Sequence, residues 1–372
     1  MTNKNKIEYK DIIAFHPGYY LKDIIDSMDI TQEDFAKRLG VSGKTISKLV
    51  NGDISISDDV AMKLSIMLGT SFHLWKNLQS TYDEKVAEIK IKQNLEDQCR
   101  IINYIDSSFF IDLGIFEKGL KKIERVKRLC EYLNTSNLNS LYERDILVNF
   151  RTGVSNFSEK NIVNSKIWLQ TAINIGKTKE VSNFDADKLY YYIDEIRSMT
   201  TQDVSVFLPR LREIFKECGV SFVLLPHLKN SGINGAVVWL DKNKVVLAIN
   251  DRRNYSDTFW FSLFHEIKHV LQQKNKTIFL SYNDKNLETL DLKLEQEADL
   301  FAQNTLIPYE EYQTYLNKNK YISKNSIISF AESINIHPGI VVGRLQYDKQ
   351  IPFNTYNDLK HKYKIVINQR AV

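Results

Sequence analysis

The sequence contains few cysteines and no long apolar run, and both absences narrow the class of protein. Its 372 residues include only Cys99, Cys130 and Cys218, an odd number without a Cys-x-x-Cys pair. A disulfide framework or a cysteine-rich zinc site is therefore not expected, and a reducing cytoplasm fits best. No apolar segment approaches the roughly 20 residues that a bilayer span requires. Residues 1–10 are polar and lack the pattern of a secretion signal, so we predict a cytoplasmic protein without a membrane partner.

A strong excess of charge of one sign is also missing. The formal net charge of +4 permits a nucleic-acid partner without demanding one. With 43% hydrophobic and 11% aromatic residues, the composition is that of a folded chain with a buried core rather than of a disordered or collagenous one. The length favours two domains joined by a helical connector.

Residues 16–89 have the pattern of a series of short helices. Thr31, Ser42 and Ser57 each precede an amphipathic stretch, and hydroxyl side chains at such positions cap helix N termini. Gly40 lies between the second and third of these helices, where a left-handed residue ends a helix and makes a tight turn. Two helices joined in this way form a helix-turn-helix, whose second helix enters the major groove of DNA.

The outward face of that second helix is predicted to contact DNA. Residues 36–52 carry four basic side chains and no acidic one, and short hydrogen-bonding groups suit a helix lying in a groove. We assign Gln32 and Lys48 to phosphates. The full predicted set is Gln32, Ser42, Lys44, Thr45, Ser47, Lys48 and Asn51. The alternative is a small helical bundle whose polar face is only solvated.

Several segments of this region carry a family resemblance. They are residues 16–22, the helix-turn-helix itself, residues 61–69, and residues 72–83, which end in Trp-x-Asn-Leu-Gln-x-x-Tyr-Asp. Together they resemble the HigA antitoxin branch of the XRE-type DNA-binding family. The resemblance implies binding to operator DNA as a homodimer, autoregulation of an operon, and a possible cognate toxin as a partner.

The middle of the chain changes character twice. Residues 91–188 are rich in lysine and glutamate with helical periodicity, and we expect a helical connector there. Residues 219–225, 232–240 and 244–249 are short runs rich in β-branched residues, which predict three strands. A small sheet is therefore expected just before the motif that carries the chemistry.

That motif is His265-Glu-Ile-Lys-His269, inside an apolar stretch of helical length. Two histidines four residues apart lie on one helical face, where neutral imidazoles can hold one tetrahedral ion. Glu266 beside them can act as general base toward a water activated by Zn²⁺. A pair of histidines satisfied within the core is the alternative. Two imidazoles and a carboxylate favour zinc over harder cations.

A second helix, residues 294–308, offers carboxylates for a third ligand. The motif His265–His269, the stretch 295–302 and the ending Leu306-Ile-Pro308 resemble the ImmA/IrrE family of zinc metallopeptidases. In that family the glutamate just before the alanine of the second motif completes the zinc site, which implies Glu297 here. Glu295 is the second choice, because two residues apart on a helix it would point elsewhere.

We therefore expect a multidomain chain: an all-α helix-turn-helix domain, a helical connector, and an α+β zincin-like metallopeptidase domain. The predicted bounds are 1–90, 91–188, 189–310 for the peptidase domain, and 311–372 for a helical C-terminal extension. The leading hypothesis is an antitoxin-like autorepressor whose zinc metallo-endopeptidase domain cleaves a repressor or the chain itself. The sequence leaves open two alternatives, a site-specific metallopeptidase acting on a repressor protein substrate, and a non-catalytic scaffold that neutralises a toxin.

Overall fold

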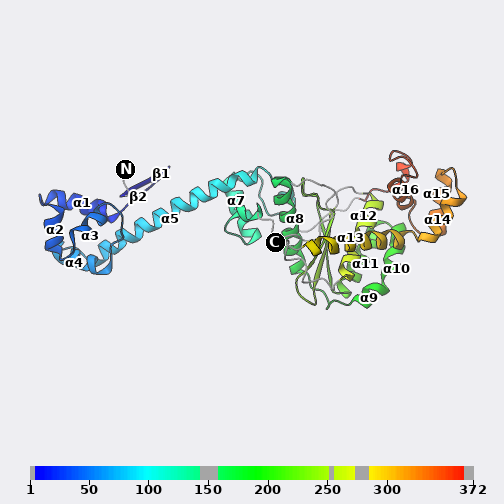
Figure 1. Cartoon of the computed structure of the whole chain (residues 1–372), viewed down its shortest axis with the longest axis horizontal. Coiled ribbons are helices and arrows are strands. Elements are labelled where there is room, and N and C mark those ends of the chain that lie inside the picture. Colours follow the sequence, from blue (N-terminus) through cyan, green and yellow to red (C-terminus); the bar gives the residue numbers. More distant parts are fainter. Residues whose placement is uncertain (1–4, 143–157, 251–254, 273–284, 364–372) are drawn as a thin grey trace. The chain divides into compact units, whose positions relative to one another are not determined.

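The computed structural model describes residues 5–142, 158–250, 255–272 and 285–363 and divides into two compact units, Met1–Cys99 and Arg100–Val372. Figure 1 labels their helices and strands along the chain. The first unit contains β1 (Lys6–Tyr9), β2 (Ile12–Phe15), α1 (Pro17–Ser27), α2 (Gln32–Leu39), α3 (Gly43–Val50), α4 (Asp58–Leu68) and most of α5 (Phe72–Ile102).

Helices α2 and α3 form the predicted helix-turn-helix. Thr31 caps α2 by accepting from the backbone N–H of Asp34, and Ser42 caps α3 by accepting from that of Thr45. Gly40 ends α2 in the left-handed region with a φ of 71°, a conformation that glycine adopts without a steric cost. The buried side chains of the two helices pack in one core with those of α1, α4 and α5. The multidomain fold class with an N-terminal helix-turn-helix is confirmed.

The N-terminal segment departs from the all-helical prediction. Strands β1 and β2 pair antiparallel with Tyr9 opposite Ile12, and Lys10 in the connecting turn has a φ of 53°. Ile12 and Ala14 of β2 pack against Ile89 of α5. The turn lacks the Asn-Gly or Asp-Gly pair that usually marks a tight hairpin in a sequence, and for that reason the sequence did not predict this hairpin.

The region expected to be a connector is not a separate body. Helix α5 is 31 residues long and extends past residue 90, and the second unit begins at Arg100. Helix α8 (Glu159–Thr178) packs on the sheet, where its Gly176 lies against Val246. The boundary predicted at residue 188 is corrected accordingly, because the apolar side of α8 is buried against strands. The other elements of this stretch are α6 (Ser107–Asp112), α7 (Lys122–Leu133) and η1 (Leu138–Tyr142).

The three predicted strands form one sheet in the second unit. They are β3 (Val220–Leu225), β4 (Gly235–Trp239) and β5 (Val245–Asn250), in the order β3-β5-β4. Strand β5 runs parallel to β3 and antiparallel to β4. Every residue of β3 and β5 is buried, because helices cover both faces of the sheet (Figure 1). Helix α8 covers one face, and the opposite face packs with α11 (Val204–Glu217) and α12 (Ser256–Leu271).

The C-terminal helices share the core of this sheet. Tyr312, Ile327, Val341 and Leu345 are buried in the same cluster as the side chains of α12. Residues 311–347 are therefore part of the folded unit, which corrects the boundary predicted at residue 310. The helices that complete the unit are α9 (Ala186–Tyr191), α10 (Ile193–Ser198), η2 (Met199–Thr201), α13 (Lys285–Leu306), α14 (Tyr309–Lys318), α15 (Lys324–Ser333), α16 (Pro338–Tyr347) and η5 (Asn357–Leu359). Within the described residues, no helix is long and apolar enough to cross a bilayer.

The turn between α15 and α16 repeats the geometry of the turn between α2 and α3. Asn335 takes the left-handed conformation of Gly40, with a φ of 53°. The N–H of Ile336 donates to the carbonyl of Ala331 at 3.0 Å. In the first turn the N–H of Val41 donates to the carbonyl of Ala36, also at 3.0 Å. His337 caps α16 by accepting from the N–H of Gly339, where Ser42 caps α3 by accepting from that of Thr45. Helix α16, unlike α3, is buried along Gly339–Val342 and against α12, so this second turn serves packing.

Candidate metal centre and nucleic-acid face

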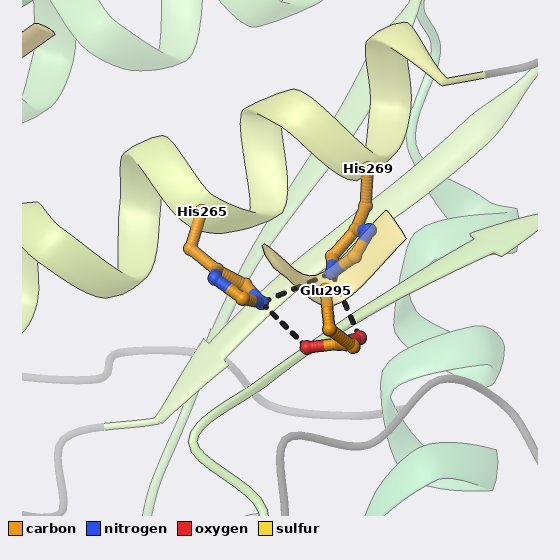
Figure 2. A group of neighbouring side chains, drawn as sticks. All are labelled: His265, His269 and Glu295. Carbon is orange, nitrogen blue, oxygen red and sulfur yellow. Dashed lines mark hydrogen bonds and ion pairs between the residues drawn. The ribbon is translucent and has the colours of Figure 1, made fainter. Parts of the chain in front are cut away.

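The two histidines of the motif lie on one face of α12. His265 and His269 are 1% and 8% exposed, and their Nε2 atoms lie 3.0 Å apart. Apolar residues on the other sides of α12, such as Trp260 and Phe264, are fully buried in the core. This packing fixes the roll of the helix, so that both imidazoles face α13 (Figure 2).

Glu295 of α13 completes the group. Its Oε2 lies 3.2 Å from Nε2 of His265, and its Oε1 lies 3.1 Å from Nε2 of His269. Figure 2 shows this carboxylate spanning the two rings. Within the part of the chain that the structure describes, these three residues form a group whose ligand atoms all lie within 4.8 Å of one another.

The outer nitrogens of both imidazoles are held by acceptors. Nδ1 of His265 lies 2.9 Å from a carboxylate oxygen of Asp299, and Nδ1 of His269 lies 2.8 Å from Oε1 of Gln272. The amide of Gln272 is oriented by its Nε2, which donates to the carbonyl of Leu294 and to Glu297. Because a carboxylate and an amide oxygen accept, the Nδ1 atoms carry the protons and both Nε2 atoms present lone pairs.

This donor set fits a zinc ion. Two imidazole lone pairs and a carboxylate converge on one point, an arrangement that a shared cation stabilises. Zn–N bonds of about 2.0–2.1 Å in a tetrahedral site put two nitrogens about 3.3 Å apart, close to the 3.0 Å that separates the two Nε2 atoms here. Acceptors behind the histidines fix their tautomer, as at protein zinc sites generally.

The pKa shifts of the site also favour a bound cation. Burial raises the pKa of Glu295, but the adjacent imidazoles of His265 and His269 outweigh burial and hold that pKa far below its usual range. Burial lowers the pKa of His269, but the neighbouring carboxylates of Glu295 and Glu266 outweigh it and raise the pKa above its usual value. Glu295 therefore stays anionic, and the group as a whole attracts positive charge.

Glu266 lies beside the histidines against the first residue of β4. Its side chain is 2% exposed, and a Cβ placed on Gly235 would lie 2.6 Å from its Oε1. Only a residue without a side chain leaves room for the carboxylate there. The sequence singled out Glu266 but not Gly235, because the close approach joins two elements distant in the chain.

The structure brings Glu295 to the histidines where the family resemblance implied Glu297. Oε2 of Glu297 instead accepts from Nε2 of Gln272 at 3.3 Å. Residues two apart on a helix point roughly 200° apart, whereas Glu295 and Asp299 are four apart and share the face toward α12. That i, i+4 pair, one carboxylate for the ligand position and one behind a histidine, is the sequence signal that identifies the face.

The predicted DNA-contacting residues gather on α3 and its cap. Ser42, Lys44, Lys48 and Asn51 are exposed, and so is Gln32 at the start of α2. Thr45 and Ser47 are half-buried, and the hydroxyls of Ser42 and Thr45 lie 2.8 Å apart. The opposite side of α3 is held in the core by Ile46, Leu49 and Val50. The DNA contacts of these seven residues stay a prediction.

These features define a class of protein, in which a helix-turn-helix unit is followed by an α+β unit with an HExxH helix. Comparison with known proteins agrees. A family model described as helix-turn-helix matches residues 21–75, and one described as the IrrE N-terminal-like domain matches residues 227–346. The second match extends through α16, as the shared core does.

Three relatives resemble about a fifth of the chain each. The uncharacterized HTH-type transcriptional regulator YddM of Escherichia coli strain K12 is 29% identical over 72 residues, which are 19% of this chain and 77% of the relative. Virulence-associated protein I of Dichelobacter nodosus is 34% identical over 76 residues, 20% of this chain and 70% of the relative. Antitoxin HigA-1 of Vibrio cholerae is 36% identical over 67 residues, 18% of this chain and 63% of the relative.

The chain belongs to the XRE-type helix-turn-helix family and carries an IrrE/ImmA-like domain behind that module. It therefore combines a transcription-regulator module of the antitoxin kind with a peptidase-like domain in one polypeptide.

Proposed function

We propose that this protein is a DNA-bound regulator whose second unit is a zinc-dependent endopeptidase acting on a repressor protein or on its own chain. The convergence of His265, His269 and Glu295 beside Glu266 carries the peptidase half of the proposal. The exposed polar face of α3 carries the DNA half. The helix-turn-helix would keep the peptidase at the operator where its substrate also binds, in the cytoplasm.

The residues of the site have separate tasks in this proposal. A zinc ion held by His265, His269 and Glu295 would supply Lewis acidity and lower the pKa of water. The carboxylate of Glu266 takes the proton from the attacking water and passes it to the leaving amine. Asp299 and Gln272 hold the histidines in the tautomer that leaves Nε2 free to coordinate.

A peptide substrate is supported by the edge of the sheet next to the site. Strand β4 begins at Gly235, against Glu266, and packs along α12. In the described part of the chain, only β5 pairs with β4. An extended peptide can add to such an edge by main-chain hydrogen bonds, which would bring its backbone past the general base.

The partners follow from the first unit. We propose that operator DNA is bound by a homodimer, and that a cognate toxin is a further partner, because the Vibrio cholerae relative is an antitoxin. Met62 and Ile66, one turn apart on α4, are 50% and 77% exposed, and such apolar side chains on a small unit suit a self-contact.

The deciding experiment measures zinc per chain by mass spectrometry for the native protein and for three variants prepared identically. About one zinc per chain is expected in the native protein and in Glu297→Ala, and none in His265→Ala or Glu295→Ala. Cleavage of a co-expressed helix-turn-helix repressor is then assayed with the native protein and Glu266→Gln, which should keep zinc and lose cleavage. Absence of zinc from the native protein after zinc is supplied would overturn the peptidase half.

A further inference from the structure

A cavity of about 470 Å³ lies in the second unit between α12, the end of α13, α16 and the segment through η5. It is distinct from the metal centre, whose three side chains do not line it. Its volume is that of a small-molecule or peptide subsite. Its apolar lining comes from Phe261, Leu306, Ile307, Ile340, Tyr347 and Phe353.

The cavity lies one helical turn along α12 from the candidate catalytic residues. Phe261 and Ser262 line it and precede His265 and Glu266 by one helical turn each, on the same faces. The ring of Phe261 lies 6.3 Å from that of His265. At the other wall, Asn234 immediately precedes β4. A peptide paired with the edge of β4 would therefore pass the mouth of the cavity.

The charged groups of the cavity are paired, which disfavours a charged ligand. Asp257 is bound to Lys360 at 2.6 Å, with both side chains nearly buried. Arg344 is bound to Asp348, also at 2.6 Å. A charged side chain entering the cavity would lose its hydration and find no net opposite charge in return.

Two buried acceptors beside the cavity have no hydrogen-bond donor among the described residues. Gln346 is 2% exposed, and its Nε2 donates to the carbonyls of Phe353 and Thr355 and to the side chain of Asn357. Those bonds fix its Oε1 as an acceptor, for which the described residues provide no donor, and the same holds for Oδ1 of Asp257. Both oxygens have almost no accessible surface, so they require no donor from a ligand, and the apolar lining is what selects it.

We propose that this cavity is the specificity subsite of the peptidase and takes a large uncharged side chain with an apolar body, such as tyrosine or tryptophan. The inference rests on the proposed function, because it assigns the cavity to a peptide substrate. It adds that a substrate residue bound between α12 and α16 determines which peptide bond is cleaved.

The test uses fluorescein-labelled peptides Gly-Gly-Xaa-Gly-Gly, with Xaa as tyrosine, glycine or glutamate, and fluorescence anisotropy with the full chain. The protein carries Glu266→Gln and is kept in EDTA, so that binding is read without zinc and without hydrolysis. The tyrosine peptide is expected to bind at least tenfold more tightly than the other two. Failure of the native protein to bind zinc would disprove the proposed function, but the affinities of the three peptides could still be compared.

Variants at the rim locate the binding. Tyr347 and Phe353 line the cavity and are 59% and 73% exposed, so replacing them should leave the fold intact. Tyr347→Ala and Phe353→Ala should each weaken binding of the tyrosine peptide about tenfold, while Tyr321→Ala, a still more exposed aromatic outside the lining, should change nothing. Equal binding of the three peptides, or an equal loss with Tyr321→Ala, would overturn the proposal.

Discussion

The amide Nε2 of Gln272 lies 3.3 Å from Oε2 of Glu297 and turns the oxygen of the same amide toward His269. Glu297 thus reaches the candidate metal centre through one intermediate residue. An amide rotated by 180° would present N–H groups to Nδ1 of His269 and favour the tautomer that cannot coordinate through Nε2.

Loss of this contact should weaken metal binding without abolishing it. We predict that Glu297→Ala lowers zinc affinity about tenfold to a hundredfold, as is usual for residues behind a ligand, and keeps one zinc per chain. Gln272→Ala should lower zinc affinity to the same extent. The double variant should bind zinc as tightly as Gln272→Ala alone, because both changes remove the same contact. Competition titration with a chromophoric chelator measures this. Gln296→Ala, exposed on the same helix, is the control. If the losses of zinc affinity added up in the double variant, Glu297 would not act through Gln272.

The contact between Gly235 and Glu266 predicts a defect of another kind. An added methyl group in Gly235→Ala would collide with the carboxylate of Glu266 and displace the general base. Peptide cleavage should fall about a hundredfold, with zinc content unchanged. Lys242→Ala, exposed after the end of β4, should cleave normally. Zinc loss in Gly235→Ala would show that the glycine supports the ligands instead of the base.

Local signals explain which parts of the fold were predictable. The helix-turn-helix is encoded by neighbouring residues, because Thr31 and Ser42 cap helices that start within one residue of them and Gly40 supplies the turn. The identity of the third site carboxylate is not local. It depends on which side of α13 rests on α12, and among near neighbours in the sequence only Asp299, four residues after Glu295, marks that side.

Long-range packing likewise decided the domain bounds. The lysine-rich stretch that suggested a connector includes α8, whose buried face meets β3 and β5. The pattern of a helix that covers a sheet resembles that of a helix within a bundle. Sequence periodicity therefore predicted the helix and did not predict its partner.

The cap of α1 predicts a pH dependence of stability. Nδ1 of His16 accepts from the N–H of Gly18 at 2.9 Å, which requires an unprotonated nitrogen, and burial lowers the pKa of His16 below its usual value. The unfolded chain therefore takes up the proton first as the pH falls. The contribution of His16 is complete above about pH 6.5 and is lost as the pH falls below it.

Melting temperatures at pH 7.5 and pH 5.5 check this. The native protein should lose a few degrees more on acidification than His16→Asn, because asparagine is also a good cap and does not titrate. His73→Asn removes an exposed histidine of α5 and should behave as the native protein does. An equal drop in His16→Asn and the native protein would exclude His16 as the titrating group.

The face of α3 predicts two different effects on DNA binding. Lys44 and Thr45 lie in its first turn, where a helix in the major groove meets base edges, and we predict that the double variant Lys44→Ala/Thr45→Ala abolishes discrimination between promoter and random DNA. Lys48 lies in the last turn and is assigned to a phosphate, so Lys48→Ala should weaken binding to both DNAs alike and reduce the slope of log affinity against log salt by about 1.

Anisotropy titrations with the promoter fragment upstream of the chain's own coding sequence, at several salt concentrations, separate the two effects. Lys90→Ala provides the control, because Lys90 is exposed on α5 beyond the matched helix-turn-helix region. The local face has to account for affinity, since the net charge of the whole chain is only +4 and long-range attraction is screened beyond about 8 Å in physiological salt. A promoter preference that survives the double variant would mean that another surface reads the operator.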